Sequence, residues 1–193
     1  MAARWPEIIS GDTVLLGEDE CHLLWGDCTG YAWGQRGQAL KVAMTNSKLR
    51  QTYYGAVNFV SREFHMKAFD AGNGHNTVAY IQWLMQLYPG KKLLLLWDGA
   101  TYHRDSQLHA FLAEVNQGLA EEDWLVTICR FAPNAPEQNP VEDLWLAGKN
   151  HLRRSFAENK TFAQVKAAFC RFLQDFSLQS AKFGWYAPQL QII

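Results

Sequence analysis

The apolar positions of this chain fall into short runs that predict strands and helices in a particular order. The longest run is residues 93–97, four leucines and a tryptophan that follow two lysines. An unbroken apolar run of this length is typical of a strand buried on both faces. Four other segments also have the pattern of strands, and the second and third of them form a tight hairpin around Ser61 and Arg62. They are residues 13–24, residues 52–60 with residues 63–69, and residues 125–131.

Helical spacing of apolar residues predicts four helices between and after these strands. They cover residues 77–87, residues 106–115, a segment that begins at Asn139, and residues 161–176. For the third helix we expect Asn139 as the N-cap, Pro140 as the first helical residue and Glu142 as the third. Antiparallel strands followed by alternating strands and helices predict an α/β fold, a five-stranded mixed sheet with helices on both faces.

The size and composition are those of an ordinary globular domain. The 193 residues are 48% hydrophobic and 19% charged, with a net charge of −1, and they contain no linker that would divide them, so we expect one domain over residues 1–193. No apolar stretch is long enough to span a membrane, and no signal peptide begins the chain. The four cysteines have no zinc-binding spacing. We therefore expect a cytoplasmic protein with reduced thiols.

Three acidic residues are the candidate catalytic groups. Asp98 directly follows the run of leucines, where open α/β folds place their chemistry, although an Asp-Gly pair also commonly starts a turn. Asp19 lies in the polar centre of the first strand, with its side chain opposite to those of Glu18 and Glu20. Glu142 lies in the first turn of its helix, where Asn139 and Glu142 also have the spacing of a capping box.

These three carboxylates would repel one another strongly if the fold brought them together, unless cations lay between them. Hard oxygen ligands favour Mg²⁺ or Mn²⁺. Two such ions serve in-line phosphoryl displacement in many enzymes. The residues therefore predict a two-cation site made by Asp19, Asp98 and Glu142.

Basic residues gather in the last third of the chain. Between residues 149 and 171 there are six lysines and arginines and one acid, Glu158. Lys149 lies two helical turns beyond Glu142, and Arg153 lies one further turn along the same face. We interpret this pair as a candidate contact to DNA phosphates, with helix-end charges that complement the dipole as the alternative.

Two segments resemble the catalytic core of the IS630/Tc1/mariner transposases, which carry a DDE triad on a ribonuclease H-like fold. They are WDGATYH at residues 97–103 and APNAPEQNPVEDLW at residues 132–145. EDE at residues 18–20 and GYAWGQRGQ at residues 30–38 resemble the family's first-aspartate segment and the Trp-bearing strand after it. The resemblance implies that Asp19, Asp98 and Glu142 form the triad, and that His103 matches a histidine common after the second aspartate, for which we expect a DNA contact.

The chain departs from the family pattern in three respects. Gly99 stands where many relatives have asparagine, and Asp98 and Glu142 are 44 positions apart (142 − 98), longer than the Tc1-type spacing. Residues 117–123 could form a loop that absorbs the added length. No helix-turn-helix region precedes Asp12, so we expect the DNA-binding region to be separate or missing.

The resemblance implies a metal-dependent enzyme that cuts transposon ends and joins the 3′-OH to target DNA, with transposon-end and target DNA and a possible second copy as partners. Two alternatives remain open at this point. One is a ribonuclease H-like nuclease that only hydrolyses, and the other is a domesticated or decayed remnant that binds nucleic acid without catalysis.

Overall fold

The fold is built on a five-stranded mixed sheet, as the order of elements predicts. The computed structural model describes residues 4–29, 33–38, 48–98, 105–132 and 138–186. The strands lie in the order β3-β2-β1-β4-β5, with β1 antiparallel to β2, β2 antiparallel to β3, and β1, β4 and β5 parallel. Their bounds are β1 Thr13–Leu24, β2 Arg50–Asn58, β3 Phe64–Phe69, β4 Lys92–Trp97 and β5 Val126–Arg130.

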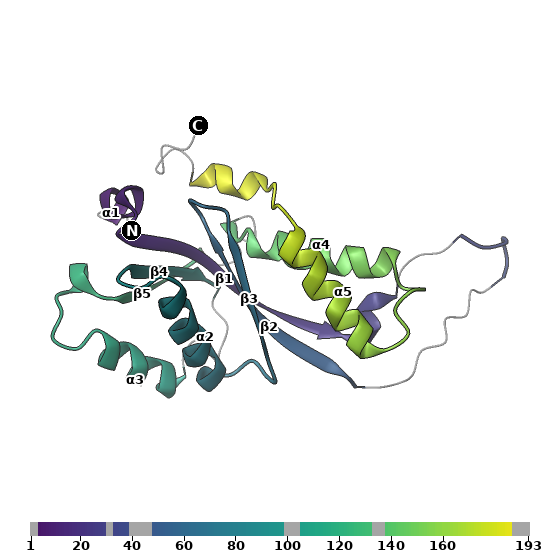
Figure 1. The fold of residues 1–193 in the computed structure, drawn as a ribbon, viewed down its shortest axis with the longest axis horizontal. Coiled ribbons are helices and arrows are strands. Elements are labelled where there is room, and N and C mark those ends of the chain that lie inside the picture. Colours follow the sequence, from purple (N-terminus) through teal and green to yellow (C-terminus); the bar gives the residue numbers. More distant parts are fainter. Residues whose placement is uncertain (1–3, 30–32, 39–47, 99–104, 133–137, 187–193) are drawn as a thin grey trace.

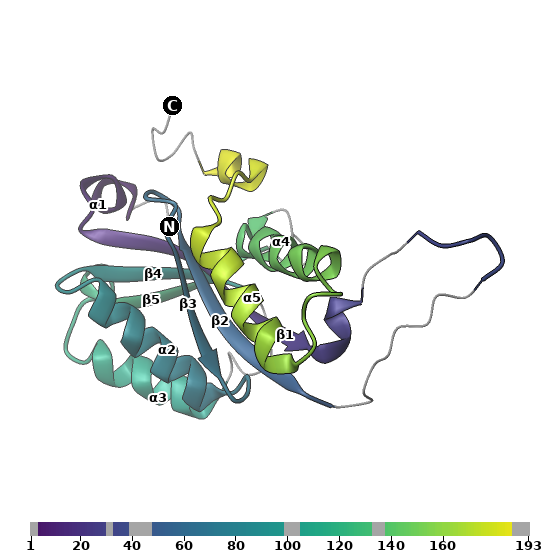
Figure 2. The ribbon, with the colours of Figure 1, turned by 45° about the vertical axis from the view of Figure 1, so that its right-hand side comes forward.

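Helices cover both faces of this sheet (Figures 1 and 2). The helices α2 and α3 pack on one face and α4 and α5 on the other. A short α1 and three 3-10 turns complete the described elements. Their bounds are α1 Trp5–Ser10, α2 Gly74–Leu87, α3 Ser106–Val115, α4 Val141–Arg154, α5 Phe162–Asp175, η2 Trp25–Cys28, η4 Glu121–Asp123 and η6 Ala181–Trp185.

The alternation of side chains along the strands divides the core into two halves. In β1, Leu15, Cys21 and Leu23 contact the core under α4 and α5, whereas Val14 and Leu16 contact the core over α2 and α3. In β4, Leu94 and Leu96 face α4 and α5, and Leu93, Leu95 and Trp97 face the opposite side. By this alternation Asp19 and Asp98 both belong to the face that α4 covers.

One glycine lets α4 lie close to the sheet. Gly55 of β2 is the direct partner of Asp19 in β1. A Cβ atom at Gly55 would lie 2.4 Å from the Trp145 ring and 2.8 Å from the Phe64 ring, closer than real Cβ atoms approach other heavy atoms. Trp145 is 5% exposed and packs edge-to-face on Phe64. The missing side chain of Gly55 therefore makes the space into which α4 inserts its tryptophan beside Asp19.

Three details differ from the sequence predictions. The helix α4 begins at Val141, so Pro140 occupies the N-cap position, and Asn139 accepts a hydrogen bond from the Val141 amide at 3.1 Å. The helix α2 begins three residues earlier than predicted, because the Asn73 side chain caps it by accepting from the Asn76 amide. Trp33 is fully exposed and lies in no strand, while Tyr31 and Ala32 lie outside the described residues.

Every helix that the structure describes is too short or too polar to cross a lipid bilayer. The cysteines Cys21, Cys129 and Cys170 are free thiols.

Candidate active site

The two aspartates lie side by side because their strands are parallel neighbours. The pairing of β1 with β4 is in register from Thr13 with Lys92 to Gly17 with Leu96. Continued by two residues, this register brings Asp19 next to Asp98, the first residue after β4. Asp19 is partly buried, and Asp98 is exposed at the end of the sheet. The structure thus supports the predicted adjacency of the strands that carry these two carboxylates.

Glu142 approaches the aspartates from the first turn of α4. The start of this helix lies against β1, since a Cβ atom on Gly17 would lie 3.7 Å from Cδ of Pro140. Glu142 is close enough to Asp19 for its charge to raise the pKa of the aspartate. Asp19, Asp98 and Glu142 therefore come from three elements to the α4 side of the sheet.

The surroundings of the Asp19 carboxyl group disfavour its negatively charged form. Burial of Asp19, followed by repulsion from Glu20, Asp98 and Glu142, raises the pKa of Asp19 to about 8. Burial removes water that would stabilise the carboxylate, and neighbouring carboxylates repel it. At neutral pH Asp19 is therefore largely protonated in the absence of a bound cation.

Glu18 lies directly behind the site, on the opposite face of β1. It is 1% exposed, and neither carboxylate oxygen has a hydrogen-bond partner among the residues that the structure describes. Burial first, then Glu20, Asp19 and Asp98, raises the pKa of Glu18 well above its usual value. The alternation predicted from the sequence separates it from Asp19, but the sequence carried no signal that Glu18 would be buried.

Lys182 of η6 is a cation at this site that the sequence analysis missed. Its Nζ atom lies 3.3 Å from Oε2 of Glu142 and 2.9 Å from Oδ1 of Asp143, and it donates to the carbonyl of Asn139 at 2.9 Å. Glu142 thus forms an ion pair with Lys182 instead of completing a capping box with Asn139. Forty residues separate Lys182 from Glu142 in the sequence, so no local pattern could have indicated the contact.

The carboxylates of Asp19, Asp98 and Glu142 have the chemistry of ligands for a hard cation, although their positions do not form a complete coordination shell. Among the described residues, no three His, Cys, Asp or Glu side chains are grouped so that they could hold a metal ion as they stand. Carboxylate oxygens are the ligands that Mg²⁺ and Mn²⁺ prefer. A cation would also relieve the repulsion that, together with burial, raises the pKa of Asp19.

The residues predicted to contact DNA lie in different surroundings, and one of them is outside the described part of the chain. Lys149 and Arg153 are both half-buried on α4, and Arg153 donates to the Asn150 side chain at 2.9 Å. Arg154 is exposed on the same helix. His103 lies outside the described residues.

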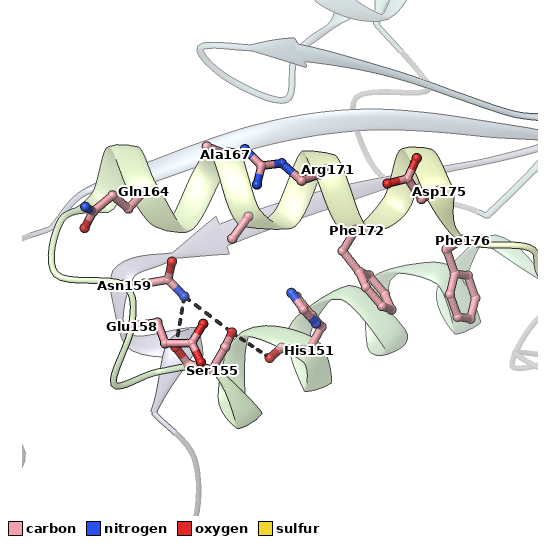
Figure 3. Close-up of a pocket in the computed structure, with 11 residues that line it drawn as sticks. His151, Ser155, Glu158, Asn159, Gln164, Ala167, Arg171, Phe172, Asp175 and Phe176 are labelled. Carbon is pink, nitrogen blue, oxygen red and sulfur yellow. Dashed lines mark hydrogen bonds between the residues drawn. The ribbon is translucent and has the colours of Figure 1, made fainter.

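A separate groove of about 650 Å³ lies between α4 and α5 (Figure 3). His151 stacks on Phe172 there, with ring centroids 4.4 Å apart. Arg171, Glu158 and Asp175 are also among the lining residues. The lining contains none of Asp19, Asp98 and Glu142, and His151 is about two and a half turns from Glu142 along α4. The groove is therefore distinct from the acidic site.

Solved structures with the same fold include viral intasome and transposase chains. A simian T-cell lymphotropic virus intasome in complex with PP2A regulatory subunit B56 gamma matches with a TM-score of 0.56 and 9% identity, over 86% of this chain and 50% of that chain. The Mos1 transposase paired-end complex with left transposon end matches with a TM-score of 0.53 and 11% identity, over 91% of this chain and 52% of that chain. The HTLV-2 integrase catalytic core domain in complex with magnesium, in its trimeric form, matches with a TM-score of 0.50 and 12% identity. This match covers 86% of this chain and 88% of that chain.

At these identities the matches show the fold alone, and they confirm the predicted ribonuclease H-like sheet of transposase and integrase cores. The chain spans about half the length of the intasome and Mos1 chains that it matches. The sequence has no significant match among curated proteins.

A family model matches most of the chain, including the four segments that resemble the transposase core. The model of the DDE superfamily endonuclease matches residues 15–164, well over half of the 193 residues. The matched region begins in β1 and includes the positions of Asp19, Asp98 and Glu142. The chain belongs to the DDE superfamily of endonucleases.

Proposed function

We propose that this chain is the catalytic domain of a metal-dependent DNA transposase of the IS630/Tc1/mariner type, which cuts transposon ends and joins them to target DNA. The observation that carries the proposal is the convergence of Asp19, Asp98 and Glu142 on the α4 side of the sheet. Burial of Asp19, followed by repulsion from Glu20, Asp98 and Glu142, raises its pKa to about 8. Membership of an endonuclease family and the fold shared with transposase cores support the same activity.

In this proposal Asp19, Asp98 and Glu142 hold two Mg²⁺ or Mn²⁺ ions. Such ions, when bound, activate the attacking oxygen and stabilise the leaving oxygen of a phosphodiester. Asp19 contributes a ligand from a rigid strand, and Asp98 contributes one from the exposed end of β4, where DNA has access. Glu142 contributes the third from a helix whose position is set by packing against Gly17 and Gly55.

DNA is the proposed partner, and Lys149 and Arg153 are its proposed phosphate contacts on α4. The Mos1 neighbour is a complex with a transposon end, which supports DNA as the ligand of this fold. A separate helix-turn-helix region would find the transposon ends, and a second copy of the chain would bring two ends together. We keep His103 as a proposed DNA contact on the resemblance alone.

The first prediction concerns the three acids. Asp19→Asn, Asp98→Asn and Glu142→Gln each keep the size of the side chain and remove a ligand charge. Each should reduce Mn²⁺-dependent nicking of DNA at least about a thousandfold, because several kcal/mol of transition-state stabilisation depend on the bound cations. Gel analysis of cleaved and joined products measures both reactions, and circular dichroism checks the fold.

Glu158→Gln is the matched control, because it removes one carboxylate from the groove between α4 and α5 and should leave cleavage unchanged. Normal cleavage by Glu142→Gln, accompanied by a lower melting temperature, would instead assign Glu142 a structural role at the start of α4. Cleaved products that are never joined would reduce the activity to hydrolysis.

The second prediction concerns the basic pair on α4. If Lys149 and Arg153 contact phosphates, the Lys149→Ala/Arg153→Ala double variant should lower the slope of log K against log salt by about two units. Binding titrations of a DNA duplex at several salt concentrations measure the slope. Arg154→Ala, which removes an exposed charge from the same helix, should leave it almost unchanged. An unaltered slope in the double variant would show that Lys149 and Arg153 do not contact phosphates and serve only as charges at the end of the helix.

The third prediction follows from the raised pKa of Asp19. In the unfolded chain this carboxyl ionises near its ordinary pKa of 3.8, whereas in the folded chain it stays protonated up to about pH 8. The folded state therefore binds more protons between these values, so stability falls as the pH rises through this window. Asp19→Asn removes this effect, and its advantage in free energy of unfolding over the natural protein should grow by roughly 2–4 kcal/mol from pH 5 to pH 8.

Urea unfolding of both proteins without divalent cations, at pH 5 and pH 8, measures this difference. Excess Mn²⁺ at pH 8 should narrow it, because the cation binds the folded natural protein and stabilises it. A difference that does not change with pH would mean that Asp19 is ionised normally and that its surroundings do not disfavour charge.

A further inference from the structure

The contacts of Lys182 give the acidic site a cation of its own. The ammonium group bridges Glu142 and Asp143 and donates to the carbonyl of Asn139. The Lys182 side chain is 18% exposed and that of Glu142 is 45% exposed. Among the ion pairs between described residues, those of Lys182 are the ones that reach the first turn of α4. The chain therefore supplies one positive charge to the two carboxylates at the start of α4.

Packing of the turn η6 holds Lys182 in this position. The neighbouring Phe183 is 6% exposed and packs edge-to-face on Phe59. The guanidinium of Arg62 lies 3.6 Å from the centre of the Phe183 ring. Ser180, the N-cap of η6, donates to Oδ2 of Asp143 at 2.5 Å. The ammonium is thus fixed by a folded segment and does not reach Glu142 through a chance side-chain position.

We propose that Lys182 is the resting counter-ion of Glu142, and that a divalent cation must take this carboxylate from it. The inference rests on the proposed function, since it assumes that Glu142 is a cation ligand. Of the three contacts of Lys182, the one to Glu142 is the longest, at 3.3 Å against 2.9 Å for the other two. Lys182 can therefore release Glu142 and keep both Asp143 and the Asn139 carbonyl.

The ion pair between Lys182 and Glu142 also affects how strongly the site would bind a cation. With Glu142 paired to Lys182, no three described ligands are grouped for a metal ion. The ammonium opposes cation binding in two ways, since it competes for Glu142 and its positive charge repels the incoming ion. The chain thus sets its cation affinity lower than the three carboxylates alone would give.

The test is the affinity of the full chain for Mn²⁺ without DNA, measured by electron paramagnetic resonance titration of free Mn²⁺. Lys182→Met keeps the length of the side chain and removes the charge. It should bind Mn²⁺ about tenfold more tightly than the natural protein, a change within the range for one unit charge near a protein surface. Lys182→Arg keeps the charge and should bind Mn²⁺ as the natural protein does.

Lys92→Met is the matched control for the loss of a bridging lysine. Lys92 also joins two carboxylates, Glu7 at 3.6 Å and Asp123 at 3.1 Å, and donates to the carbonyl of Glu122. It lies at the other end of the sheet from the acidic site, at the start of β4. Its substitution should leave Mn²⁺ affinity unchanged, whatever it does to the melting temperature.

Equal or weaker Mn²⁺ binding by Lys182→Met would overturn the counter-ion role and leave the proposed function intact, provided that Asp19→Asn abolishes the binding. Weaker binding in particular would show that Lys182 only holds the start of α4 in place. Absence of Mn²⁺ binding by the natural protein and by Lys182→Met would overturn both the counter-ion role and the cation site on which it rests.

Discussion

Five residues of β1, from Thr13 to Gly17, pair in parallel with Lys92 to Leu96 of β4, and the position of every candidate catalytic group depends on this register. Side chains alternate between the faces of a strand, so a slip of one residue would move Asp19 to the α2 side and bring Glu18 to the α4 side. Gly17 of β1 opposes such a slip, because a Cβ atom at this position would lie 2.9 Å from the Phe59 ring, and neither Leu16 nor Glu18 would fit there. The close packing on the α4 side of β1 therefore specifies which carboxylates can meet.

The second requirement is that α4 lies close enough for Glu142 to approach the aspartates. Glycines make this approach possible at three places. Gly17 leaves room for Phe59 beside Pro140, Gly55 leaves room for Trp145, and Gly148 of α4 itself leaves room for Phe169 of α5. A Cβ atom at any of these positions would lie 2.9 Å or less from an aromatic ring. The aromatic residues around α4 thus pack at full density only because these backbone positions carry no side chain.

Much of this fold follows from local patterns in the sequence. The unbroken leucines predict the buried strand β4, and the alternation in residues 13–24 places Asp19 and Glu18 on opposite faces. The pairing of β1 with β4 follows from the order of strands and helices, which few topologies satisfy. The capping of α4 was harder to predict from the sequence. Asn139 stands one position before the N-cap, and Glu142 has an ion-pair partner far along the chain.

The features that could not be predicted all depend on contacts between distant segments. Lys182 looks like an ordinary surface lysine in the sequence, and only the packing of Phe183 on Phe59 brings it to Glu142. The complete burial of Glu18 results from the rings and helices that cover its face of the sheet. Both features change the charge balance of the site. Motifs can therefore indicate which residues are catalytic candidates, but the balance of charge around them comes from tertiary structure.

In the proposed function, Asp19, Asp98 and Glu142 form one cation site for DNA chemistry. The most direct measurement is X-ray diffraction from crystals of the protein with a DNA duplex and Mn²⁺, with anomalous scattering used to locate the manganese. We expect manganese within about 2.5 Å of carboxylate oxygens of both Asp19 and Asp98, with Glu142 turned from Lys182 toward the ion. Manganese bound only elsewhere, for example at Glu158 and Asp175 in the groove between α4 and α5, with the three acids unoccupied beside bound DNA, would contradict it.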